Sequence, residues 1–155
     1  MNRTHFQLLP ISASEADRLR TLGGQLYVSD EFPGYPCRQC LQDAEIGQQL
    51  LLVSFDPFRV DSPYRSAGPI FLHVNSCSPT VSINQMFPIQ LTCRQLSVRC
   101  FDSQAMMIDA ALIQGTELEA TLNGFFDSET TSYVDVHNAV RGCWAVRVER
   151  AVPIS

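Results

Sequence analysis

The sequence predicts an α+β fold with two short helices and a mostly antiparallel sheet of about six or seven strands, which could close into a barrel-like form. Segments with strand patterns follow one another in runs instead of alternating with helices, and this order favours antiparallel pairing. Helix signals occur in two places only. Because no repeat or linker divides the chain, we expect a single domain over 1–155, with a helix and lead-in at 1–25 and the main body at 26–155.

Both helix predictions rest on the same start signal. Residues 13–22 and 115–126 each begin near a capping box, in which a Ser or Thr is followed three residues later by Glu. The two pairs are Ser12 with Glu15 and Thr116 with Glu119. Gly23 is a stop signal for the first segment, so that helix is expected to end at residue 22.

Strand patterns occupy most of the remaining chain. Two continuous apolar runs follow turn residues and are typical of strands buried on both faces, while two later segments alternate with a period of two. Two further segments resemble strands less closely, and the short turn "AVRG" predicts a C-terminal hairpin. The expected strands, in order, are 49–55, 68–74, 96–101, 106–113, 132–138 and 144–149.

Charge and composition narrow the classes of partner. The net charge of −5 and the pI near 5.0 disfavour binding to nucleic acid, because the overall field repels phosphates. All 11 basic residues are arginine, so any anion site would use guanidinium, imidazole or backbone N–H groups. The sequence shows no secretory signal and no apolar run of about 18 residues. We therefore expect a cytoplasmic protein with free thiols, no membrane partner and no cofactor, and the oligomeric state stays open.

The segment "GYPCRQC" contains a C-x-x-C pair, Cys37 and Cys40, which permits three interpretations. A structural zinc site would need two more ligands, for which His137 and Cys143 are the expected candidates. Thioredoxin-like redox chemistry would need a helix after the pair, and no helix signal follows it. The third interpretation is that both are buried packing thiols. His73 is expected to be a strand-face histidine with a satisfied hydrogen bond.

Three arginines lie next to turn residues. Arg38, Arg65 and Arg141 could each project a guanidinium toward a carboxylate or phosphate, and together they could form one anion pocket. The alternative is that each is an ordinary solvated or salt-bridged surface arginine.

The segment "HNAVRGCW" holds the densest group of reactive side chains. A thiol and an imidazole within hydrogen-bond reach would form a nucleophile and base, with Cys37 or Cys143 as thiol and His137 as base. Asn138 or Asp135 could orient the imidazole. The alternative is an ordinary hairpin turn, in which His and Asn are common.

Four blocks of the sequence resemble a family of bacterial proteins classed as domain of unknown function 1203. They are "GYPCR" with "LQDAEIGQQLLLVSF", "SPYRSAGPIF", "LSVRCFDSQAMMIDAALIQGTEL" and "YVDVHNAVRGCWAVRVER". The resemblance runs from about residue 26 to the C-terminus and implies a small, mostly bacterial, single-domain protein without a known activity. The matching positions are Cys37, Arg38, Asp43, Pro63, Tyr64, Arg65, His137, Asn138, Gly142 and Cys143. Cys40 lies outside the family pattern.

These observations lead to two main functional hypotheses. The first is a pocket that binds a small anionic molecule or performs cysteine- and histidine-dependent chemistry. Its catalytic residues would be Cys37, His137 and Cys143, and its ligand-binding residues Arg38, Tyr64, Arg65, Asn138 and Arg141. The second is a non-catalytic interaction or structural module, in which Tyr64, Arg38 and Arg65 form a partner surface. A structural zinc-binding domain is a further alternative.

Overall fold

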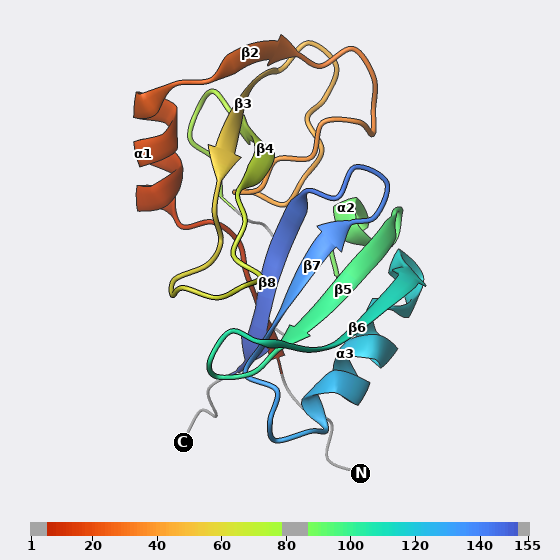
Figure 1. Ribbon diagram of the computed structural model, residues 1–155. Helices are drawn as coiled ribbons and strands as arrows, with labels where there is room; N and C mark the ends of the chain where they lie inside the picture. Colours follow the sequence, from red (N-terminus) through yellow and green to blue (C-terminus); the bar gives the residue numbers. More distant parts are fainter. Residues whose placement is uncertain (1–5, 79–86, 152–155) are drawn as a thin grey trace.

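The computed structural model describes residues 6–78 and 87–151, and in them the chain forms two antiparallel sheets (Figure 1). The large sheet has the strand order β1-β8-β7-β5-β6, and the small sheet has the order β2-β3-β4. The strands are β1 Phe6–Leu9, β2 Gln25–Val28, β3 Gln49–Phe55, β4 Gly68–His73, β5 Gln95–Phe101, β6 Met107–Gln114, β7 Tyr133–Asn138 and β8 Trp144–Arg150. The segment from Phe6 to Leu22 links the sheets, because β1 joins the large one and α1 follows it toward the small one.

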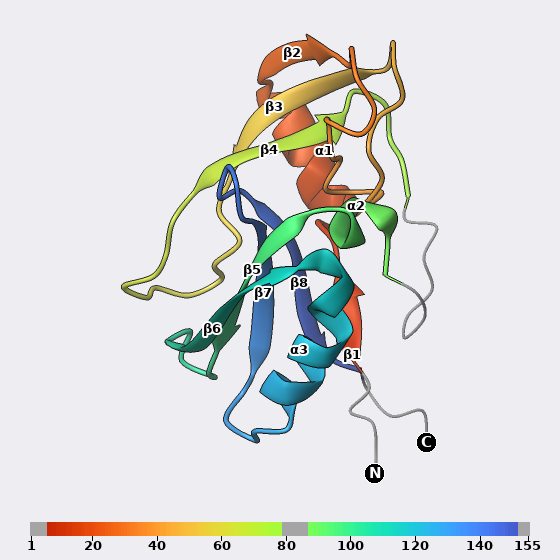
Figure 2. The same cartoon turned by 90° about the vertical axis from the view of Figure 1, so that its right-hand side faces the viewer.

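Three α-helices are described, and each is short. α1 (Ala13–Leu22) packs on the small sheet, α2 (Ile89–Thr92) precedes β5, and α3 (Leu118–Phe126) lies along the large sheet (Figure 2). The side chain of Ser12 caps α1 by accepting a hydrogen bond from the Glu15 N–H at 3.2 Å. None of the helices of the described chain is long and apolar enough to span a membrane.

The main core lies between α3 and one face of the large sheet. Register places Val98 of β5 beside Val136 of β7, which in turn pairs with Val146 of β8. These valines belong to the same buried cluster as Leu118 and Leu122 of α3. Each fully buried aliphatic side chain contributes roughly 1.5–3 kcal/mol of transfer free energy, so this half of the molecule has a substantial core of its own.

The opposite face of the large sheet is polar at its centre. Asp135 of β7 is fully buried and accepts two hydrogen bonds from Arg147, at 2.9 and 3.0 Å, and one from Trp144 Nε1 at 3.2 Å. The connection between β3 and β4, residues 56–67, covers part of this face, and its Phe58 packs edge-to-face against Phe101. The charged groups are therefore paired beneath a loop and do not face water.

The expected fold class is confirmed, with differences in detail. The structure is α+β and mostly antiparallel, but residues 6–78 and 87–151 form eight strands in two separate sheets and no closed barrel. The first helix occupies the predicted bounds. The second begins at Leu118, after a 3₁₀ turn at Gly115–Glu117, because the capping box forms between Gln114 and Glu117 at the end of β6. The four-residue strands β1 and β2 were not predicted.

Candidate metal centre

Sulfur and nitrogen atoms that can bind a metal converge near the end of β4. They belong to Cys37, Cys40, His73 and Cys77, which we call the Cys3His cluster, and the ligand atoms all lie within 4.8 Å of one another. The sulfurs of Cys37 and Cys77 are 3.7 Å apart, and the Cys40 sulfur is 3.6 Å from Nδ1 of His73. Two thiolates bound tetrahedrally to zinc at 2.3 Å lie about 3.8 Å apart. The cluster therefore has the dimensions of a site for one ion.

A tight turn presents the first two ligands. Pro36 and Asp43 form an antiparallel bridge, and the Cys37 N–H donates to the Gln42 carbonyl at 3.0 Å. Within the turn, Leu41 has a φ of 61°, which is a left-handed conformation uncommon for a bulky residue. Such conformations persist where the surroundings over-determine them, and they are common at ligand-binding turns. The backbone thus turns both sulfurs of the C-x-x-C pair toward one point.

Strand β4 and the residues after it supply the other two ligands. Cys37 forms a parallel bridge with Phe71, and the Arg38 N–H donates to the Phe71 carbonyl at 3.0 Å, which aligns the turn with β4. His73 is the last residue of β4, and its N–H donates to the Cys37 sulfur at 3.4 Å. Cys77 follows four residues later. Pairing of the turn with β4 therefore joins ligands that lie far apart in the sequence.

The imidazole of His73 is held with one nitrogen directed toward the cluster. Its Nε2 lies 3.0 Å from Oε1 of Gln48, and an N–H there donates to this oxygen and leaves Nδ1 as the ligand atom. Metal-bound histidines commonly make such a second hydrogen bond, which fixes the tautomer and the ring orientation. Without a metal, hydrogen bonds to the sulfurs of Cys37 and Cys77 raise the pKa of His73 to about 9.

The cluster favours a thiolate even without an ion. Hydrogen bonds from Cys40 and Cys77 lower the pKa of Cys37, and the hydrogen bonds that Cys40 makes to Cys37 and Cys77 raise the pKa of Cys40. Thiolates are the form of cysteine that binds metals, so the pocket already stabilises one ligand in its binding state.

Arg38 brings a buried positive charge to the metal-binding turn, where it interacts with Cys37. Its side chain is 1% exposed and donates to the backbone carbonyls of Trp144 and Pro36. Among the described residues no carboxylate forms a salt bridge with Arg38, and burial lowers its pKa. A buried charge without a counter-charge is costly. Three thiolates, one neutral imidazole and a divalent ion carry a net charge of −1, which would balance the guanidinium.

The donor set indicates which ion suits the site. Three cysteines and one histidine form one of the usual tetrahedral zinc centres, and soft sulfur ligands disfavour calcium and magnesium. Four protein ligands fill the coordination shell, which is typical of structural zinc. Cys40, His73 and Cys77 also line an open cavity of about 1100 Å³, whereas Cys37 is fully buried. An ion could therefore enter through the cavity and also bind the buried sulfur of Cys37.

The residues predicted from sequence fall in several places. His137, Arg141 and Cys143 line a second, smaller cavity at the β7–β8 hairpin, away from the residues that line the large one. His137 Nδ1 bonds to the Gly142 carbonyl at 3.0 Å, and no hydrogen bond joins Cys37 to His137 or Cys143 among the described residues. The described residues thus show no hydrogen bond between the nucleophile and base expected in Cys37 and His137.

The remaining predicted ligands contact other parts of the protein. Arg65 pairs with Asp56 and Asp61, both at 2.7 Å, so its guanidinium holds the β3–β4 connection together. Tyr64 lies edge-to-face against Phe101. The side-chain oxygen of Asn138 is buried and has no hydrogen-bond partner, on the same hairpin as the small cavity.

Two of the four zinc ligands considered from the sequence belong to the Cys3His cluster. Cys37 and Cys40 take part, but the structure places His73 and Cys77 beside them instead of His137 and Cys143. His73 was expected to be a strand-face residue because it ends an apolar run. The signal available in the sequence was the spacing H-x3-C over residues 73–77, which complements C-x2-C as in other zinc sites.

Comparison with known proteins gives one match. The model of a family described as "Protein of unknown function (DUF1203)" matches residues 34–150, a span that contains the whole Cys3His cluster. No curated protein and no solved structure matches the chain.

Proposed function

The chain belongs to the DUF1203 family, whose description assigns no function, and from the geometry of its side chains we propose that it is a zinc-binding domain with one structural Zn²⁺ in the Cys3His cluster. The observation that supports this most strongly is the convergence of three sulfurs and an imidazole nitrogen within 4.8 Å, with the second imidazole nitrogen bonded to Gln48. Four protein ligands leave no open position for a substrate.

The proposed ion would stabilise the small sheet and its surroundings. The core beside it contains nine buried residues, of which Cys37 and Cys40 are themselves ligands. Zinc binding in small structural sites provides roughly 10–16 kcal/mol, which is comparable to the whole stability of a typical domain. The ion would therefore determine whether the turn, β4 and the segment that ends at Cys77 stay together.

Metal analysis of the purified chain tests the proposal. We expect one zinc per chain in protein that has never met a chelator, and a loss of that zinc in Cys40→Ser and Cys77→Ser. Cys93→Ser is the matched control, because Cys93 is an exposed free thiol outside the cluster. Absence of stoichiometric zinc in the wild type, or retention of it in both cluster variants, would refute the role. Cobalt substitution adds a check, since sulfur ligands give strong charge-transfer absorption.

A zinc role also affects the earlier hypotheses. A thiolate of Cys37 that binds zinc is not available as a nucleophile, so we do not assign catalysis to Cys37 and His137. Arg65 and Tyr64 make internal contacts, and this disfavours a partner surface built on them. None of the six cysteines forms a disulfide, which suits a reducing compartment, and we propose a cytoplasmic location on that basis.

A further inference from the structure

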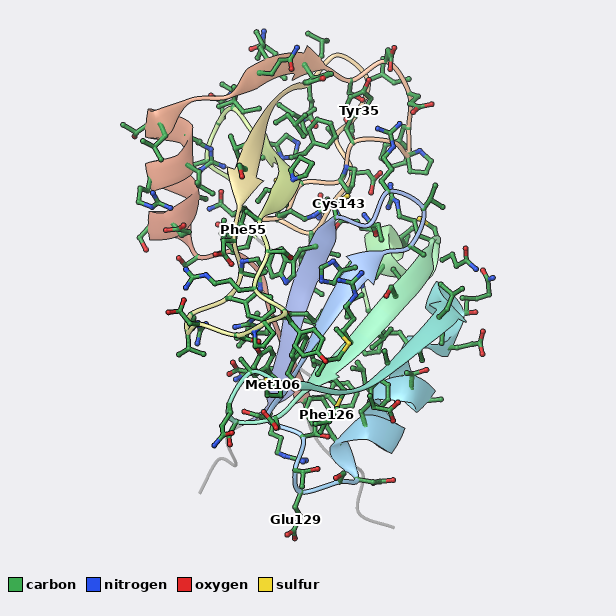
Figure 3. The ribbon with its side chains drawn as sticks, in the orientation of Figure 1. Tyr35, Phe55, Met106, Phe126, Glu129 and Cys143 are labelled. Atoms are coloured by element: carbon green, nitrogen blue, oxygen red, sulfur yellow. The ribbon has the colours of Figure 1, made fainter. Side chains whose placement is uncertain are left out.

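A second cavity lies where the β3–β4 connection meets the β7–β8 hairpin. Its volume is about 110 Å³, which is room for roughly four water molecules at 30 Å³ each. Figure 3 shows Cys143 at the start of β8 and Phe55 at the end of β3, and both residues line this cavity. The lining combines residues of the connection with Arg99 of β5 and with the hairpin residues His137 and Arg141.

The cavity is positively charged in a negatively charged protein. Arg99, His137 and Arg141 line it, and no aspartate or glutamate does so among the described residues, although the chain has a net charge of −5. The nearest buried carboxylate, Asp135, is already occupied by Arg147 and by Trp144 Nε1. Arg99 and Arg141, the two cations at the cavity, therefore form no salt bridge with a carboxylate among the described residues.

The guanidinium groups have free donors. Arg99 makes one hydrogen bond, from Nε to Ser97 Oγ at 3.2 Å, and forms no salt bridge in the described part of the chain. Arg141 is exposed and has no hydrogen bond or ion pair to any described residue. Two guanidiniums with free N–H groups can hold an oxyanion in the paired geometry that arginine favours.

The walls of the cavity indicate which kind of oxyanion would fit. Phe55 and Trp144 are packed with their ring centroids 5.0 Å apart, and both line the cavity together with Pro57 and Pro69. Apolar walls beside cations suit a ligand with a charged end and a short hydrocarbon end. Inorganic phosphate has no apolar group to place there.

We propose that this cavity, the arginine pocket, binds a small organic carboxylate of two to four carbons through Arg99 and Arg141, with its hydrocarbon end against Phe55 and Trp144. The site is separate from the zinc centre, and its occupation does not require the zinc proposal to hold. Arg38 is the link between them, because its Nε donates to the carbonyl of Trp144 in the pocket wall.

His137 provides a sensor for binding. Its Nδ1–H donates to the Gly142 carbonyl. Burial is the main cause that lowers the pKa of His137, and the nearby charge of Arg99 lowers it further. The charged and titratable groups around it are Arg99 from β5, Asp135 on its own strand, Arg38 from the metal-binding turn, and Arg141 and Cys143, which line the same cavity. An anion bound between the arginines would favour the imidazolium, so the pKa of His137 should rise on binding.

The experiment titrates the purified chain with sodium propionate at constant ionic strength and follows the ring signals of His137 by NMR. Parallel titrations use formate, butyrate and inorganic phosphate. We expect saturable binding of propionate, a rise in the pKa of His137, and about tenfold weaker binding in Arg141→Gln. Arg59→Gln is the control. Arg59 lies on the β3–β4 connection, its side chain is 73% exposed, and it does not line the pocket.

Each outcome decides the proposal. Binding that is saturable, stronger for propionate than for phosphate, and weakened in Arg141→Gln but not in Arg59→Gln supports it. It is overturned by the absence of saturation in the millimolar range, by equal effects of the two substitutions, or by phosphate binding at least as tightly as propionate. Since Arg141 is exposed, its replacement is not expected to disturb folding, and a circular dichroism spectrum checks this.

Discussion

Replacing Arg38 with methionine tests whether the buried guanidinium and the metal centre balance each other. Methionine has an unbranched apolar side chain that can replace the aliphatic stem of arginine, so Arg38→Met removes the cation while it keeps the apolar contacts of the stem. The change leaves the carbonyls of Trp144 and Pro36 without their charged donor. It also removes a buried cation that interacts with Cys37 and has no salt bridge to a carboxylate among the described residues.

Removal of one partner from a buried charge pair typically costs about 3–5 kcal/mol. For a chain of 155 residues this corresponds to a decrease in Tm of about 6–20 °C. Stability is measured by denaturant unfolding of the zinc-loaded protein, and zinc affinity by competition with a chelator. Arg18→Met is the matched control, since Arg18 has a 58% exposed side chain and pairs only with Glu15 on α1. That control should lose less than about 1 kcal/mol.

The decisive comparison is a double-mutant cycle with Cys77→Ser. If Arg38 balances the metal centre, its replacement should cost less once the centre has lost zinc, with a coupling energy of at least about 1 kcal/mol. The reasoning is refuted if Arg38→Met costs less than about 1 kcal/mol. It is also refuted if Arg38→Met leaves zinc affinity unchanged and costs the same stability in the wild-type chain as in Cys77→Ser.

Three further predictions concern neighbouring groups. Gln48→Ala should weaken zinc binding by about 10–100-fold in chelator competition, because His73 loses the acceptor that orients its ring; an unchanged affinity would contradict this. Asp135→Asn should destabilise the protein by about 3–5 kcal/mol in denaturant unfolding, since it leaves Arg147 buried without its carboxylate, and a cost below about 1 kcal/mol would show that the pair is not needed. The pKa of His137 is lower in the folded state than in the unfolded state, so the unfolded state binds the proton more tightly. The neutral imidazole therefore contributes its full stability above about pH 6.5, and this stability is lost as the pH falls below that value. His137→Gln should flatten that part of the pH–stability curve relative to wild type, and identical curves would exclude the assignment.

Most of the fold follows from local sequence signals. The bounds of α1 follow from Ser12, Glu15 and the glycine pair after it, and β3 has the bounds that its apolar run predicts. β1 and β2 escaped prediction because four residues show no clear period, and their strand conformation depends on pairing with β8 and β3. The partition into two sheets likewise depends on pairing, which sequence patterns do not specify.

The candidate sites show the same division more clearly. The sequence by itself determined which chemistry was available: a C-x-x-C pair at a turn, a histidine at the end of an apolar run, arginine as the only strong base, and a reactive hairpin. Only the tertiary structure decided which residues meet. The parallel bridge between Cys37 and Phe71 carries the turn to β4 and so brings His73 and Cys77 to the sulfurs, while His137 and Arg141 come to face Arg99. The physical reason is that a site depends on distances between side chains, and those distances are set by backbone pairing between segments far apart in the chain.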